Sequence, residues 1–328
     1  MVDSAELIAG IVKGSPRHRA GTRPIHSYGI GVTGSYRPTD VAGRFTTARP
    51  LVDPATTVTV RFSNSSGNEG SSDCDPDVRG MAVRFHGDDG EPAFDLVSTT
   101  LPVFFVRHVE SFRRFTAAAV PPDPPKGRPR WADLVDSLHL RQPPTRPSPN
   151  AAGLFAFSLA HPEACPALVA NGSESTPESY VARSYHPVHA FRLTAADGTS
   201  RFVRFHWEPV AGVRVSTTTA EQYLVADLRE RVAAGAVQFV LRAQVAEQGD
   251  DTTDLTRPWP QTRRRIVLGH LTLGTVVDDA DATEDLAFDP SCLPPGVDCD
   301  PDDEIFAVRG EVYRASARAR RRERALHP

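Results

Sequence analysis

The sequence contains few of the residues that mark a disulfide-rich or metal-binding protein. Its 328 residues include four cysteines, two methionines and three tryptophans. The cysteines are dispersed, and none belongs to a CxxC pair. Cys292 and Cys299, in a proline-rich turn, are the closest in sequence and are near enough to form a bridge. Because thiols in the cytosol normally stay reduced, the default expectation is four free cysteines.

The sequence also lacks a dominant charge and a long apolar run. Its 37 Lys and Arg residues against 41 Asp and Glu residues leave a net charge of −4, which gives no reason to expect a nucleic-acid partner. One basic run, Arg318–Arg324, is predicted to be a solvated helix face or tail. No window of about 18 apolar residues predicts a membrane span, and the N-terminus lacks the apolar centre of a signal peptide. We therefore expect a cytoplasmic protein with no membrane partner.

The residues that are present favour a globular protein built mainly from strands and turns. Apolar residues make up 40 % of the chain, and its 29 prolines and 23 glycines predict many turns. Eight segments alternate in the manner of strands. They are Gly29–Tyr36, Thr57–Phe62, Met81–Phe85, Phe94–Ser98, His189–Thr194, Arg201–His206, Val237–Ala246 and Ile266–Leu273. This pattern predicts an antiparallel sheet closed into a barrel.

Helical patterns are fewer. Leu154–Asn171 is predicted to be partly helical, with interruptions at Pro162 and Pro166, and Thr219–Ala234 is predicted to be a helix that ends before Gly235. Val120–Ala151 is too rich in proline for regular structure except around Trp131–His139.

The last predicted helix, Glu304–Arg324, has an unusual row of side chains. Arg309 lies four residues before Tyr313 and Arg320 lies seven after it, so the three are roughly aligned along the helix. One interpretation is an arginine that packs on a tyrosine in the core. The other is a tyrosinate metal ligand, because a phenol with a pKa of about 10 needs a nearby cation and a metal to ionise at neutral pH.

Ordered blocks of sequence favour the second interpretation. Phe288–Tyr313 (FDPSCLPPGVDCDPDDEIFAVRGEVY) resembles the proximal haem segment of catalases, and Arg23–Gly34 (RPIHSYGIGVTG) resembles their distal segment. Further blocks follow in catalase order: VRFS at Val60–Ser63 with GNEGS at Gly67–Ser71, DVRGMAVRF at Asp77–Phe85, DLVSTTLPVFFVR at Asp95–Arg107, HAFRL at His189–Leu193 and FHWEP at Phe205–Pro209. The resemblance covers about residues 15 to 320. The sequence is thus similar to the catalase superfamily, and within it to the short catalase-related peroxidases.

This resemblance implies an α+β fold: a catalase-like eight-stranded antiparallel β-barrel with surrounding helices and a C-terminal proximal haem helix. It implies one haem domain over residues 1–328, with the barrel at about 20–275 and a wrapping segment and proximal helix at about 276–324. The helical and flavodoxin-like C-terminal domains of full-length catalases are expected to be absent. Family members are usually dimers or tetramers, so a homodimer or homotetramer is expected.

The resemblance also assigns site residues around a haem b group. Tyr313 matches the axial iron ligand, and Arg309 matches the arginine that keeps the tyrosine ionised. His26 matches the distal histidine, which moves a proton between the oxygens of bound peroxide, and Ser63 matches the serine bonded to it. The remaining matches are predicted to hold the haem: Arg23, Arg61 and Arg320 through its propionates, and Phe105 and Phe112 through ring contacts.

One departure from the catalase pattern affects the expected activity. Ser98-Thr99-Thr100 aligns with the GNN of catalases, so Thr99 occupies the position of the catalytic asparagine. A threonine hydroxyl is shorter than an amide and offers fewer donors. Rapid oxidation of a second peroxide is therefore less favoured than in catalases.

Three functions remain open at this point. The leading one is a haem peroxidase that uses hydrogen peroxide or an organic hydroperoxide to oxidise a small organic reductant, with weak catalase activity. The second is a specialised hydroperoxide dehydratase of the allene-oxide-synthase type or a haem oxidase of secondary metabolism, although Ile25 replaces the threonine that allene oxide synthases place before the distal histidine. The third is a haem-binding protein without turnover.

Overall fold

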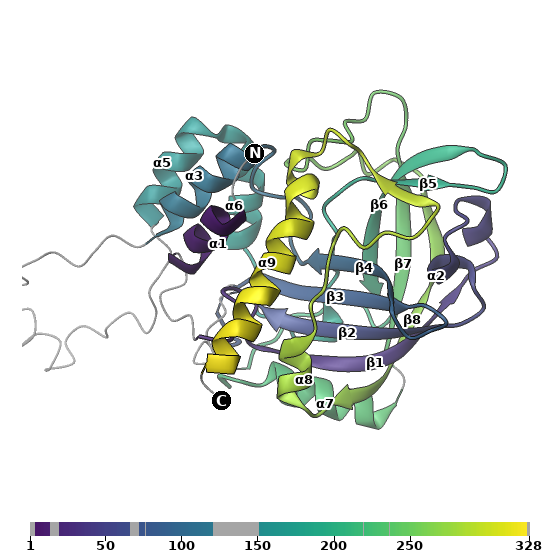
Figure 1. Ribbon diagram of the computed structural model, residues 1–328, viewed down its shortest axis with the longest axis horizontal. Helices are drawn as coiled ribbons and strands as arrows, with labels where there is room; N and C mark the ends of the chain where they lie inside the picture. The colour runs from purple at the N-terminus through teal and green to yellow at the C-terminus, as the bar shows by residue number, and fades with distance from the viewer. Residues whose placement is uncertain are drawn as a thin grey trace, which may run out of the picture.

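The computed structural model describes residues 4–13, 20–65, 72–75, 77–120, 151–218, 220–235 and 237–326. Its centre is a curled antiparallel sheet with the strand order β4-β3-β2-β1-β8-β7-β6-β5-β9 (Figure 1). The strands are β1 (Gly29–Pro38), β2 (Thr56–Asn64), β3 (Arg79–His86), β4 (Pro92–Thr99), β5 (Phe191–Thr194), β6 (Ser200–Pro209), β7 (Val237–Val245), β8 (Arg265–Val277) and β9 (Val297–Cys299). All eight predicted strands are present within a few residues of their expected bounds. The ninth, β9, pairs with β5 and lies in a segment predicted to be turns.

The sheet closes on itself through single bridges rather than through a continuous ladder. Thr99, at the end of β4, exchanges two backbone hydrogen bonds with His186, and Tyr185 does the same with Trp207 of β6. Residues 185–186 therefore join the two halves of the curled sheet. This arrangement fixes the backbone at Thr99.

The interior of the curled sheet holds the main hydrophobic core. Alternate residues of the strands point into it, as their period-two pattern requires. The largest of its fully buried side chains are aromatic: Tyr36, Phe62, Phe85, Phe94, Tyr180, Tyr185, Phe205, Trp207 and Phe239. Such rings bury a large apolar area each and dominate the packing energy.

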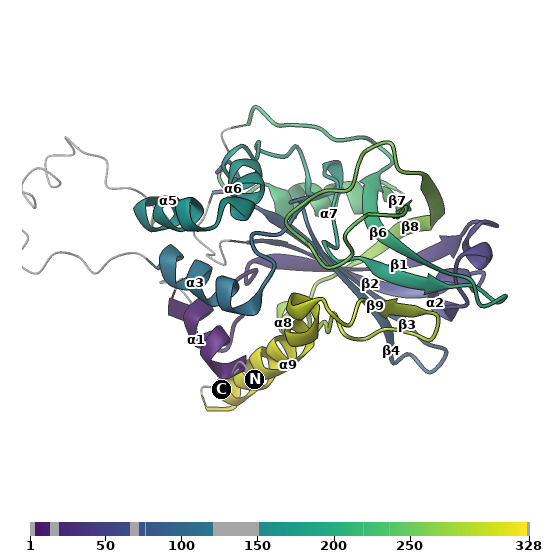
Figure 2. The same cartoon turned by 90° about the horizontal axis from the view of Figure 1, so that it is seen from above.

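Helices lie outside the sheet (Figures 1 and 2). Figure 2 shows α1, α3, α5 and α6 grouped beside one end of the sheet, with α9 next to them. The longer helices are α1 (Ser4–Lys13), α3 (Val109–Ala119), α5 (Ala151–Ala160), α6 (Cys165–Gly172), α7 (Leu224–Ala234), α8 (Ala280–Asp285) and α9 (Glu304–Leu326), and the short ones are α2 (Arg49–Val52), η1 (Ala42–Arg44), η2 (Pro162–Ala164) and η3 (Tyr180–Ala182). A second hydrophobic cluster, which includes Leu7, Val106, Phe157 and Ile305, holds this group together.

The helix predictions were confirmed in part. The interruption between α5 and α6 includes Pro162, as predicted, but Pro166 lies in the first turn of α6 and does not interrupt it. Helix α9 covers the predicted C-terminal helix, and α7 begins at Leu224 rather than at Thr219. Trp131–His139, Gly67–Ser71 and most of the proline-rich stretch 120–151 lie outside the described residues. No described helix is by itself long and apolar enough to cross a membrane; only α5 and α6 taken together have that length, with a 117° bend between them.

Candidate functional site

A cavity lies between α9 and the end of the sheet formed by β2, β3 and β4. It contains about 920 Å³ of empty space, part of which opens to solvent. Eight of the ten predicted site residues line it: His26, Ser63, Thr99, Arg23, Arg61, Arg309, Arg320 and Tyr313. Apolar side chains, including Ile8 and Ile11 of α1, complete the lining.

The register of β2, β3 and β4 positions the residues on one side of the site. Ser63 of β2 pairs with Gly80 of β3, and Gly80 pairs with Thr99 of β4, so these three residues form a row across the sheet. A Cβ atom on Gly80 would lie 2.8 Å from both His26 Nδ1 and Ser63 Oγ. Position 80 therefore needs glycine, because only the missing side chain leaves room for the His26–Ser63 pair.

His26 is held in a strained and electropositive environment. Its Nδ1 lies 3.0 Å from Ser63 Oγ, and its φ of +58° is in the left-handed region that non-glycine residues rarely adopt. Arg61 fixes this backbone by donating to the carbonyls of His26 at 2.8 Å and Ser27 at 2.9 Å. Burial, aided by the charges of Arg61, Arg23, Arg309 and Arg79, lowers the pKa of His26 to about 3. The ring is therefore neutral at physiological pH and able to accept a proton.

The other side of the site is a chain of polar groups that runs from the buried Asp303 and His189 to the half-buried Arg309 and Tyr313. Arg309 Nη2 donates to Tyr313 Oη at 3.1 Å, and its guanidinium lies over the tyrosine ring. Arg309 Nη1 contacts His189 Nε2 at 2.7 Å, and His189 Nδ1 contacts Asp303 Oδ2 at 2.7 Å. Burial lowers the pKa of His189, although Asp303 opposes this effect, so the ring is neutral, donates from Nδ1 to Asp303 and accepts from Arg309.

Asp303 also belongs to the start of α9. Its Oδ1 accepts a hydrogen bond from the Phe306 backbone N–H at 2.9 Å, which is a typical N-cap contact. The cap and the polar chain therefore share one carboxylate, and this couples the helix start to the orientation of Arg309.

Three arginines, of which Arg61 and Arg320 are buried, line a third part of the cavity. Arg23 and Arg61 both bind Glu284 Oε1 of α8, at 2.7 Å and 2.9 Å, and Arg320 donates to Ser316 Oγ at 3.2 Å. Burial lowers the pKa of Arg61 to about 9 and that of Arg320 to about 10, and it also lowers that of Arg23. The Nε atoms of Arg61 and Arg320 are buried without a hydrogen-bond partner in the part of the chain that the structure describes. One glutamate does not balance three guanidinium groups, so this region suits a ligand with carboxylates.

Residues 11–325 match the sequence model of the Catalase family. The protein belongs to the catalase family. Catalase-related peroxidase of Mycolicibacterium paratuberculosis is 31 % identical over 317 residues, which are 94 % of this chain and 92 % of that protein. Catalase-2 of Bacillus subtilis is 30 % identical over 296 residues, which are 84 % of this chain and 40 % of that protein.

Solved catalase structures share the fold. A fungal catalase has a TM-score of 0.75 at 24 % identity, covering 93 % of this chain and 60 % of its own. A bacterial catalase has the same TM-score at 23 % identity and covers 93 % of this chain and 58 % of its own. The predicted catalase-like α+β fold is therefore confirmed, with nine strands instead of eight. This chain spans about 40 % of Catalase-2 and nearly all of the catalase-related peroxidase.

The two phenylalanines predicted from the catalase resemblance do not line the cavity. Phe105 stacks on Phe115 with ring centroids 4.6 Å apart, and Phe112 stacks on Phe104 at 5.7 Å. Phe112 belongs to α3 and Phe105 precedes that helix, and both pack against the second hydrophobic cluster. The structure therefore places them in the packing beside the site.

Sequence reasoning missed several groups at this catalase-family site. Glu284, Gly80, His189 and Asp303 were not singled out, because each is an ordinary residue until the strand register and the turn before α9 place it. Ser98 was singled out only by its match to the catalase pattern, and its Oγ is buried without a partner among the described residues. Because side chains alternate along a strand, Ser98 shares the core-facing side of β4 with Phe94 and Leu96, whereas Thr99 is on the cavity side.

Proposed function

We propose that this catalase-family protein is a haem-dependent peroxidase. It would use hydrogen peroxide or an organic hydroperoxide to oxidise a small organic reductant, with weak catalase activity. The observation that carries the proposal is that one cavity joins the neutral His26–Ser63 pair to the Arg309–Tyr313 pair. A protein that only binds haem needs no residue for proton transfer at the cavity, whereas a peroxidase does.

The cavity residues fit haem b. Tyr313 would hold the iron through its phenol oxygen, to which Arg309 Nη2 donates a hydrogen bond at 3.1 Å. Arg23, Arg61 and Arg320 would bind the two propionates, which supply the carboxylates that the uncompensated arginines lack. When bound, haem would supply the iron that binds peroxide and the redox chemistry of the reaction.

His26 and its neighbours would handle the protons. With Nδ1–H directed at Ser63 Oγ, the unprotonated Nε2 accepts the proton from one peroxide oxygen and returns it to the other. The strained backbone, Arg61 and Gly80 hold the ring in that orientation before substrate arrives. Thr99, on the cavity side of β4, would offer a short hydroxyl donor to the substrate in place of its long 3.5 Å contact with the Leu101 carbonyl.

The proposal is tested with Tyr313→Phe, which keeps the ring but removes the ligand oxygen. The wild-type chain, expressed with haem supplied, is expected to show the absorption spectrum of a ferric haem with tyrosinate ligation and to consume peroxide when guaiacol is present. The variant is expected to bind much less haem and to lose turnover. Unchanged haem content and peroxide consumption in the variant would contradict the proposal.

A specialised hydroperoxide enzyme is the second candidate, and Thr99 with Ser98 is the observation that favours it. Turnover of alkyl or lipid hydroperoxides without turnover of hydrogen peroxide would select this candidate over the peroxidase.

A further inference from the structure

A second pocket opens on the surface next to the cavity. It lies between the β3–β4 pair and the chain that follows α8, and Arg84, Asp95, Leu286, Ala287, Cys292 and Arg321 are among the residues that line it. We call it the outer pocket. Its volume of about 690 Å³ lies within the range of pockets that bind small organic molecules.

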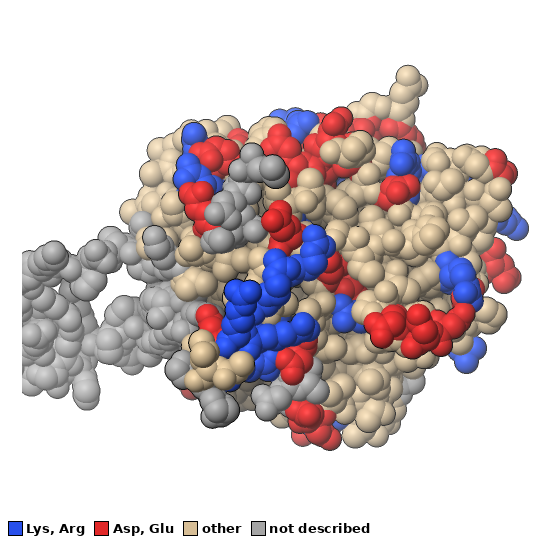
Figure 3. All heavy atoms as spheres, in the orientation of Figure 1, with Lys and Arg blue, Asp and Glu red and all other residues tan. Residues whose placement is uncertain are grey.

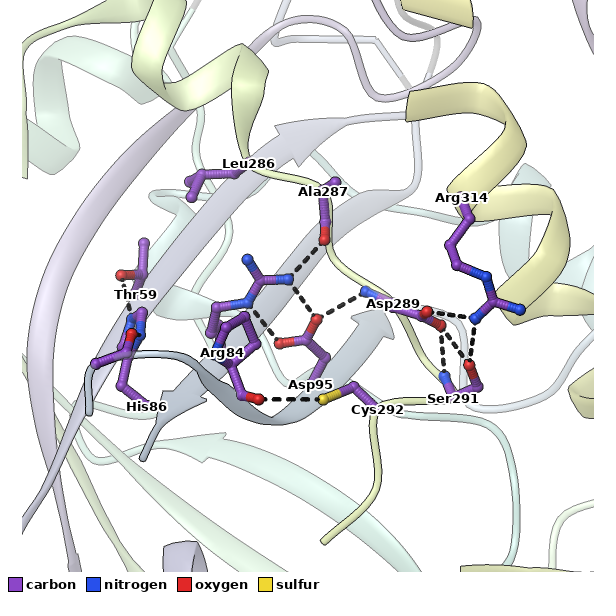
Figure 4. A network of polar contacts seen from close by, with 12 residues as sticks. Thr59, Arg84, His86, Asp95, Leu286, Ala287, Asp289, Ser291, Cys292 and Arg314 are labelled. Atoms are coloured by element: carbon purple, nitrogen blue, oxygen red, sulfur yellow. Dashed lines mark hydrogen bonds and ion pairs between the residues drawn. The ribbon is translucent and has the colours of Figure 1, made fainter. Parts of the chain in front are cut away.

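Only a thin wall separates the outer pocket from the cavity. Leu286 and Ala287 line both spaces. Arg23, from the cavity side, donates to the Leu286 carbonyl, and Arg84, from the outer side, donates to the Ala287 carbonyl at 2.6 Å (Figure 4). The wall is therefore one stretch of chain outside any helix or strand, fixed by an arginine on each side.

The acids of the outer pocket are all neutralised by arginines. Figure 4 shows two of these pairs, in which Arg84 binds both oxygens of Asp95, at 2.9 Å and 2.6 Å, and Arg314 binds Asp289 at 2.5 Å. The third acid, Asp285, pairs with Arg324. These pairs leave no net negative charge to repel an anion.

One cation at the outer pocket is left over. Arg321 lines the pocket, is exposed, and has no ion pair in the described parts of the chain. Figure 3 shows basic side chains gathered along the C-terminal half of α9, where Arg314, Arg318, Arg321 and Arg322 are exposed. The acids of the pocket, their three partner arginines and Arg321 together carry one excess positive charge, although the whole chain carries a net charge of −4.

We propose that the outer pocket binds an anionic organic reductant, such as a phenol that carries a carboxylate, and holds it against the Leu286–Ala287 wall. This inference rests on the proposed peroxidase function. The carboxylate binds at Arg321, and the phenol gives up one electron and one proton at the wall. The balanced reaction is one hydrogen peroxide plus two phenols giving two waters and two phenoxyl radicals, with the carboxylates unchanged.

The test uses two reductants that share one phenol, 4-hydroxycinnamate and its uncharged methyl ester. Arg321→Gln is expected to raise KM for the acid roughly fivefold, as for loss of an exposed charge pair, and to leave KM for the ester unchanged. Arg322→Gln is the matched control, because it removes the same charge from an exposed site that does not line the pocket. Equilibrium dialysis of 4-hydroxycinnamate with the haem-loaded protein, without peroxide, is expected to show the same fivefold weakening in Kd.

The outcomes separate this inference from the proposed function. If the acid does not bind in dialysis, or if Arg321→Gln and Arg322→Gln weaken it equally, the outer pocket is not the site and the inference is overturned. An equal rise in KM for the acid and for the ester in Arg321→Gln would also overturn the inference. If the wild-type protein consumes no peroxide with the acid, the ester or guaiacol, the proposed peroxidase function fails. The dialysis result would still decide whether the outer pocket binds the anion.

Discussion

At the scale of single residues, the His26–Ser63 pair depends on the absence of a side chain at position 80. Gly80→Ala would place a Cβ 2.8 Å from His26 Nδ1 and from Ser63 Oγ, a distance that Cβ atoms do not tolerate. We expect the variant to bind haem through the untouched Tyr313 and arginines but to lose turnover by about 100-fold, the size of a general acid–base contribution. Haem absorbance and the rate of guaiacol oxidation measure the two effects separately. Full activity in this variant would show that the His26 position is not critical.

Positions 98 and 99 are expected to set the balance between peroxidase and catalase activity. Ser98→Gly together with Thr99→Asn restores the catalase pattern at these two positions and replaces the Thr99 hydroxyl by a longer amide donor. We expect oxygen release from hydrogen peroxide to rise at least about tenfold relative to guaiacol oxidation, because one oriented hydrogen bond in the transition state is worth at least that much. An oxygen electrode measures the release. Thr100→Ser, next in sequence but not lining the cavity, is the matched control, and an equal rise there would contradict the assignment.

At the scale of elements, α9 packs closely against the turn before it at Gly310. A Cβ on Gly310 would lie 2.7 Å from the Cβ of Ser291. Gly310→Ala improves intrinsic helix propensity by about 1 kcal/mol, but we expect the overlap to outweigh this and to lower the free energy of unfolding by roughly 1–3 kcal/mol. Haem affinity should fall with it, since Tyr313 is on the same helix. Urea unfolding and haem titration measure these changes.

Gly43 provides the control, because a Cβ there would meet no atom within 4 Å. Gly43→Ala is expected to change stability by less than about 0.5 kcal/mol. If Gly310→Ala were equally neutral, the contact between α9 and the turn would not position the helix.

The strands were predictable because period-two alternation is a local signal, and the buried aromatic residues of β6 and β7 reinforce it. The strand β9 was missed because three residues are too few to show a period. The helix α3 was not predicted. Its residues directly follow a block that resembles catalases, and Phe112 was considered there as a haem contact, while the helical spacing of the apolar residues was not used. Its Phe112 and Phe115 in fact form part of an aromatic cluster.

The residues of the candidate site could be predicted only where they belong to a sequence motif. His26, Tyr313 and the arginines come from blocks with fixed spacing. Glu284 and the Asp303–His189 contact depend on residues that are about 114 to 261 positions apart in the chain, and no local pattern links them. The placement of Phe105 and Phe112 away from the cavity likewise depends on how α1, α3 and α9 pack.

At the scale of the whole molecule, buried neutral histidines predict sensitivity to acid. Burial lowers the pKa of His26 and of His186 to about 3 and that of His206 to about 4. Between about pH 6.5, where an unfolded histidine titrates, and about pH 3–4, the unfolded chain binds protons at these sites and the folded chain does not. The free energy of unfolding of the haem-free protein is therefore expected to fall as the pH is lowered through this window.

The variant His186→Gln isolates one of these histidines. It is expected to reduce the slope of stability against pH by up to about 1.4 kcal/mol per pH unit, measured by urea unfolding between pH 4 and pH 7. His270→Gln, at an exposed position, is expected to change the slope little. If His186→Gln leaves the slope of stability against pH unchanged, His186 is not held in its neutral form by the folded protein.

The bridge between Thr99 and His186 has a consequence for how this fold can diversify. Two main-chain hydrogen bonds hold residue 99, so the identity of its side chain contributes nothing to that attachment. Two of the four threonine codons become asparagine codons by a single nucleotide change. A lineage with such a codon can exchange the two residues in one genetic step, and the reactivity at this position can then vary while the backbone bridge stays the same.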